Sequence, residues 1–85
     1  MDLINVDQYY QIFKDAAAAV RANIELCRSM PGRDQAELAE IEAELGRSEA
    51  TATGRDLAFW QGRQGGELHV VLEQLHERVV RESRR

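Results

Sequence analysis

The chain contains one cysteine, one proline and no long run of hydrophobic residues. Because Cys27 has no second cysteine to pair with, an internal disulfide is excluded and nothing points to an oxidising compartment. The longest apolar runs fall well short of the roughly 20 residues that a membrane-spanning helix needs. The first residues also lack the pattern of a signal peptide. We therefore expect a cytoplasmic protein with no membrane contact.

The sequence also lacks the motifs of common catalytic and nucleotide-binding sites. It contains no Gly-x-Gly-x-x-Gly loop, no P-loop, no His-Glu-x-x-His pair and no nucleophile elbow. We therefore expect no enzymatic activity and no cofactor. The net charge of −4, with arginines clustered only near the C-terminus, argues against nucleic-acid binding.

The strongest positive feature is a heptad pattern near the start of the chain. Its members are Val6, Tyr10, Phe13, Ala17, Val20, Ile24 and Cys27. The steps between them alternate between four and three residues, so all seven side chains line one stripe of a helix. A helix cannot bury such a stripe alone. The stripe, called the seam below, must pack against another helix of this chain or of a partner.

Caps and breaks predict three helices, at about 6–29, 34–61 and 66–83. Asn5 or Asp7 can cap the first helix, and Asp34 can cap the second. For the second helix, the alternative to a continuous run to 61 is a break near Gly54, with Asp56 starting a short separate turn. The expected fold is all-α, with residues 1–85 forming one domain. It is a small three-helix bundle, or a long helical hairpin with a third helix, and we expect a homo-oligomer.

One pair of residues has the spacing of a metal half-site. Glu73 and His76 form a Glu-x-x-His pair on one helix face, and His69 lies seven residues before His76. Carboxylate-bridged iron proteins use this pair on bundle helices. A complete site would also need glutamates from facing helices, here Glu25, Glu37, Glu40 or Glu44, or a second copy of the chain. The alternative interpretation is that these residues flank the core, where they stay solvated or pair with arginines.

An acidic ridge and an aromatic cluster are the candidate partner-binding features. The ridge comprises Glu37, Glu40 and Glu44, which could meet a basic partner or simply form a solvated helix face. Phe59 and Trp60 precede a glycine-rich stretch, and Trp60 could either cover the end of the bundle or serve as an exposed interface anchor. Tyr9 lies at the edge of the seam, where it could pack on the core or stack on a ligand.

These observations favour a non-catalytic protein–protein interaction module. An adaptor, a secretion chaperone and a phage-type inhibitor would all satisfy the sequence. The alternative is a homo-oligomer that binds a metal or a small anionic ligand between protomers. If Trp60 is an exposed anchor, Trp60→Ala should spare folding and weaken partner binding.

Overall fold

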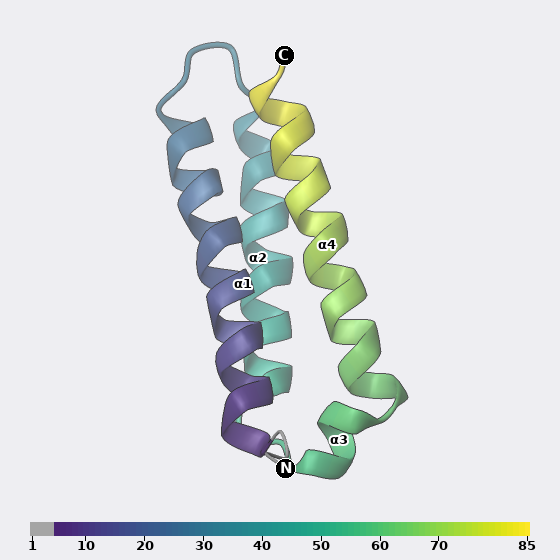
Figure 1. Cartoon of the computed structure of the whole chain (residues 1–85). Helices are drawn as coiled ribbons and strands as arrows, with labels where there is room; N and C mark the ends of the chain where they lie inside the picture. Colours follow the sequence, from purple (N-terminus) through teal and green to yellow (C-terminus); the bar gives the residue numbers. More distant parts are fainter. Residues whose placement is uncertain (1–4) are drawn as a thin grey trace.

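The computed structural model describes residues 5–85, and within them every regular element is a helix. The helices are α1 (Val6–Arg28), α2 (Gln35–Ala52), α3 (Leu57–Gln61) and α4 (Arg63–Ser83). The three long helices lie side by side, with α2 running opposite to α1 and α4, and the short α3 crosses one end (Figure 1). The molecule is elongated, with extents of 49 × 22 × 16 Å. The expectation of an all-α bundle is confirmed.

Side-chain caps start the first three helices. The side chain of Asn5 accepts a hydrogen bond from the backbone N–H of Gln8, whose own side chain accepts from the Asn5 N–H. Asp34 caps α2 by accepting from the N–H of Glu37, and Asp56 does the same for α3. Each cap satisfies a first-turn N–H that has no partner within the helix, which fixes where the helix begins.

The expected continuous second helix over 34–61 is wrong. The chain breaks after Ala52, and a separate helix, α3, starts at Leu57. Gly54 adopts a φ of +74° in this break, a left-handed conformation that costs glycine little. Asp56 then caps α3, as the alternative interpretation held. The last long helix also begins earlier than expected, at Arg63 instead of residue 66, so Gly65 and Gly66 lie inside it.

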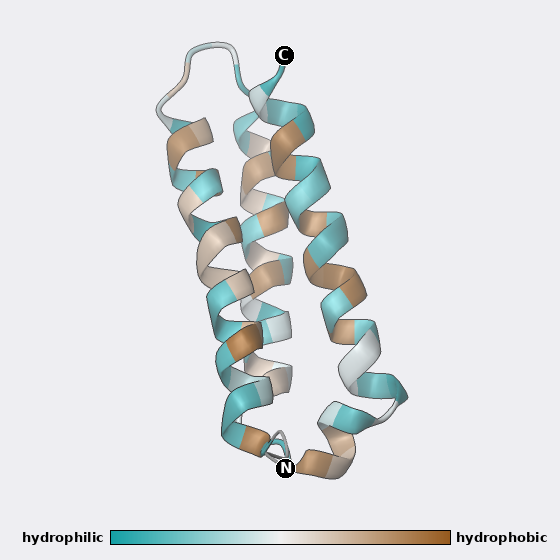
Figure 2. Cartoon of the chain, viewed as in Figure 1, coloured by the Kyte–Doolittle hydropathy of each residue, from teal (hydrophilic) through white to brown (hydrophobic). Residues whose placement is uncertain are grey.

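The seam of α1 forms the centre of the core. Its members from Phe13 to Cys27 are at most 2% exposed and pack against the apolar sides of α2 and α4. The facing residues are Leu38, Ile41 and Leu45 of α2 and Leu68, Leu72, Leu75 and Val79 of α4. Hydrophobic and hydrophilic residues alternate along each long helix, as expected for helices that bury one side (Figure 2). The partner that the seam requires is therefore supplied by the chain itself.

None of the helices in residues 5–85 combines the length and apolar character needed to cross a membrane.

Candidate protein-binding face

A second stripe on α1 remains open to solvent. It consists of Ile12, Ala16, Ala19, Asn23 and Leu26, each of which precedes a residue of the seam by one position. The stripe therefore lies about 100° further round the helix and keeps the same heptad spacing. Ile12 and Leu26 are 54% and 63% exposed. No member carries a charge, and we call this set the uncharged stripe.

The uncharged stripe borders a groove between α1 and α4. The groove has a volume of about 270 Å³ and is lined by Ala16, Ala19, Val20, His69, Leu72, Glu73 and His76. Alanines form the α1 wall because their small side chains leave space there. Together, the uncharged stripe and the residues His69, Glu73 and His76 form the α1–α4 face. In Figure 1, α2 lies behind this face.

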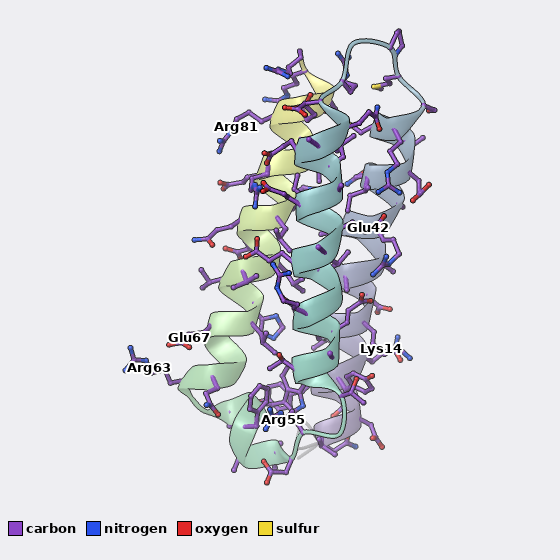
Figure 3. The ribbon with its side chains drawn as sticks, turned by 180° about the vertical axis from the view of Figure 1, so that it is seen from behind. Lys14, Glu42, Arg55, Arg63, Glu67 and Arg81 are labelled. Carbon is purple, nitrogen blue, oxygen red and sulfur yellow. The ribbon has the colours of Figure 1, made fainter. Side chains whose placement is uncertain are left out.

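The positively charged residues of α1 lie on its opposite flank. Lys14 stands over the ring of Tyr10 at 5.5 Å, Arg21 pairs with Glu49 of α2, and Arg28 pairs with Glu42 at 2.8 Å. Seen from the α2 side, Lys14 and Glu42 are both visible, and Arg63 and Glu67 project away from the start of α4 (Figure 3). The cations of α1 are therefore directed to α2 and leave the α1–α4 groove free of positive charge from this helix.

The predicted metal half-site residues come together in the α1–α4 groove. His69, Glu73 and His76 all line it. Within residues 5–85, however, no three His, Cys, Asp or Glu side chains are arranged so that they could hold a metal ion. Two of the ridge glutamates expected to complete the set, Glu37 and Glu44, instead pair with Arg78 across the contact of α2 and α4. A metal site would need a second chain.

The acidic ridge is partly neutralised within the molecule. Arg78 donates to Glu37 at 2.8 Å and to Glu44 at 3.2 Å. The hydrogen bond to Glu37 raises the pKa of Arg78 above its ordinary value, with smaller contributions from the negative charges of Glu37, Glu44 and Glu40. Glu40 lies 3.7 Å from Arg78 with its side chain 75% exposed. Of the three ridge residues, Glu40 is therefore the most accessible to a partner.

Trp60 covers the end of the bundle and is not an exposed anchor. It is 4% exposed, and the centre of its ring lies 5.6 Å from that of Phe13 and 6.1 Å from that of His69. Phe59 is half-buried between the edge of Trp60 and the guanidinium of Arg55, which lies 4.9 Å from the centre of the Phe59 ring. The α3 helix positions these rings by closing the end where α1 and α4 begin (Figure 1).

Tyr9 is also half-buried and packs against the core. This placement matches the first of its two expected roles, packing at the core edge.

A cavity at the end of the bundle opposite to α3 is lined by both arginines and carboxylates. Its volume is about 430 Å³, and it is lined by Asp34, Glu37, Arg78, Arg81, Glu82 and Arg85. Glu82 is buried, and its carboxylate accepts from the backbone N–H of Asp34 at 2.7 Å and from Arg85 at 3.2 Å. Two of the three arginines, Arg78 and Arg85, are therefore already paired. This cavity joins the end of α4 to the start of α2 and offers little unpaired charge for an anion.

The uncharged stripe is not the strongest pattern in the sequence. The spacing of Ile12, Ala19 and Leu26 was visible in the sequence, but the stronger seam lies one position away and includes the larger aromatic residues.

A scan against protein-family models, a search of curated proteins and a search of solved structures each return no match.

Proposed function

We propose that the protein is a non-catalytic helical interaction module that binds a macromolecular partner through its α1–α4 face. The observation that carries the proposal is the uncharged stripe, which remains exposed although the same helix already buries a complete seam. Ile12 and Leu26 are each more than half exposed. Covering the exposed part of such a side chain is worth about 1 kcal/mol, so a partner that covers both gains appreciable affinity.

The shape of the face suits a helical partner. Three long helices in a bundle leave the position of a fourth open, and here that position lies along the groove between α1 and α4. An amphipathic helix laid into such a groove presents apolar residues at three- and four-residue steps, the same steps as the uncharged stripe. An adaptor, a secretion chaperone and a phage-type inhibitor would each need a surface of this kind.

Site-specific photo-crosslinking in cells tests the proposal. A photoreactive amino acid at Leu26 should give crosslinks, because this residue is 63% exposed on the α1–α4 face. The matched control is the same amino acid at Arg47, which is exposed on α2, away from the face. The expected result is a defined adduct from position 26 and none from 47. Adducts from neither position, or equally from both, would contradict the proposed binding face.

A second candidate function is a homo-oligomer that holds a metal ion between protomers. It is favoured by the meeting of His69, Glu73 and His76 in one groove, where imidazole and carboxylate groups are suitable ligands. Metal analysis of protein purified without chelator tests it, with His76→Ala as the matched variant. Stoichiometric metal that is lost in the variant would support this function. Equal, substoichiometric metal in both proteins would exclude it.

A further inference from the structure

We propose that the occupant of the α1–α4 face is a second copy of this chain, packed antiparallel about a two-fold axis that passes beside Ala19. The inference rests on the proposed function, because it uses the same face, and it adds the identity and orientation of the partner. Two features of the face support it: the order of side-chain sizes and the available area.

The side chains of the uncharged stripe are ordered by size in a way that complements itself. Large residues, Ile12 and Leu26, stand at its two ends, and the alanines lie near its centre. Ile12 is seven residues before Ala19 and Leu26 is seven residues after it. An antiparallel copy centred on Ala19 therefore sets Ile12 of each chain opposite Leu26 of the other. Ala19 then meets Ala19 of the copy at the axis, where its small size lets the two helices approach to about 8 Å, and Ala16 lies opposite Asn23.

Two contacts between α1 and α4 locate the axis on α4. The Phe13 and His69 rings lie 6.3 Å apart, and the Cys27 thiol lies 3.9 Å from the carbonyl oxygen of Val79. These two contacts fix how α1 and α4 are aligned, and Ala19 shares its groove with Glu73 and His76. A two-fold axis beside Ala19 and perpendicular to the helices places α4 over its copy. Because these contacts place Ala19 level with about residue 73 of α4, Glu73 of each chain then lies near the axis and His76 lies one turn further along.

Antiparallel pairing covers the whole α1–α4 face. With an axis perpendicular to the helices, α1 packs on α1 and α4 packs on α4, so both sides of the groove are covered. Helices of 23 and 21 residues make a strip about 32 Å long and two helices, about 20 Å, wide. This strip is on the order of 650 Å² in projection, close to the roughly 800 Å² per partner that stable interfaces bury. Antiparallel helix dipoles also attract each other.

Cysteine crosslinking tests the axis directly. Under mild oxidation, Ala19→Cys should form a disulfide-linked dimer, because the two introduced thiols meet at the axis. Ala43→Cys, at an exposed alanine of α2, is the matched control and should stay monomeric on a non-reducing gel. The native Cys27 is 1% exposed, so the unaltered chain should also remain uncrosslinked.

The orientation is tested by two further variants, Ile12→Cys and Leu26→Cys. Antiparallel pairing predicts a crosslink when the two variants are mixed and little when either is oxidised alone. Crosslinking of Ile12→Cys with itself would indicate a parallel pair and overturn the proposed axis. Failure of Ala19→Cys to crosslink above the Ala43→Cys control would overturn it as well.

Association is measured separately by native mass spectrometry over a dilution series. The unaltered chain should be dimeric at high concentration. Leu26→Glu should weaken dimerisation by about a hundredfold, because each dimer loses two leucines from the interface. Its thermal melt should retain cooperativity, since Leu26 is exposed in the single chain.

A chain that remains monomeric at every concentration would refute the second copy as partner. The photo-crosslinks from position 26 distinguish this failure from failure of the proposed function. Adducts with a different protein would leave the interaction module standing and overturn only the self-pairing, whereas the absence of any adduct would overturn both.

Discussion

Two adjacent glycines of α4 should respond in opposite ways to the same substitution. A Cβ atom added to Gly65 would lie 2.7 Å from the carbonyl oxygens of Phe59 and Trp60 and 2.8 Å from the Trp60 Cα atom. All three are backbone atoms, so no side-chain rotation can relieve the contact. A Cβ atom at Gly66 would meet nothing within 4 Å. The difference arises because Gly65 is the point where α4 turns back against α3.

The expected change in the free energy of unfolding of each variant follows from two opposing effects, helix propensity and overpacking. Replacing a glycine inside a helix by alanine gains about 1 kcal/mol of stability from helix propensity. At Gly66 this gain stands alone, so Gly66→Ala should raise the free energy of unfolding by about 1 kcal/mol. At Gly65 the backbone of α3 must move by more than half an ångström to restore an ordinary contact. Overpacking of this kind costs about 1–3 kcal/mol, so Gly65→Ala should be destabilising by up to about 2 kcal/mol.

Urea denaturation measures both variants, with two probes recorded together. The fluorescence of Trp60 reports on the α3–α4 corner, because it is the only tryptophan of the chain, and circular dichroism at 222 nm reports on all helices. Gly66→Ala should shift both transitions to higher urea, and Gly65→Ala should shift both to lower urea. If Gly65→Ala were as stabilising as Gly66→Ala, α3 would not pack against the start of α4 as described.

Three further predictions concern side chains that hold the bundle together. Trp60→Ala should lower the free energy of unfolding by about 3–5 kcal/mol, because Trp60 is buried. This reverses the expectation from the sequence that the substitution spares folding, and a thermal melt measures the change. Arg78→Met should cost about 1 kcal/mol in dilute buffer and less in concentrated salt, as measured by urea titration, since a partly exposed ion pair is screened. Because Glu37 raises the pKa of Arg78, this contribution is present across neutral pH and is lost as the pH rises through that raised value. Glu82→Ala should cost about 1–3 kcal/mol in the same titration, and Glu82→Gln less, since it keeps an acceptor for the Asp34 N–H.

The core of this fold was predictable because the apolar residues of α1 that recur at helical spacing are also the residues that are buried. The residues of the seam from Phe13 to Cys27 are buried as their spacing predicts. The break after Ala52 was harder to predict, because Gly54 costs a helix only about 1 kcal/mol and tertiary contacts can offset that cost. The break is stabilised by Trp60, which packs on Phe13 only when α3 turns across the end of the bundle.

The candidate site was less predictable, because it depends on which helix lies beside which. Glu37 and Glu44 form an acidic ridge in the sequence, but Arg78 reaches both only when α4 packs next to α2. Likewise, Ala19 and Glu73 share a groove although they lie far apart in the chain. A helical wheel shows which residues share a stripe. It does not show whether the neighbouring helices cover that stripe or leave it open.

The distribution of exposed apolar side chains explains why self-association would stop at two copies. Among the large hydrophobic residues exposed in the described chain, Ile12 and Leu26 belong to α1 and none belongs to α2; the others are Met30, Leu57 of α3 and Val70 of α4. A two-fold pair uses the same patch on both copies, so it consumes the uncharged stripe of each and leaves none free for a third. The outward side of α2 would remain in solvent, where exposed charges such as Glu40 and Arg47 oppose further stacking. The uncharged stripe of α1 and the charged flank of α2 together favour a closed dimer over a filament.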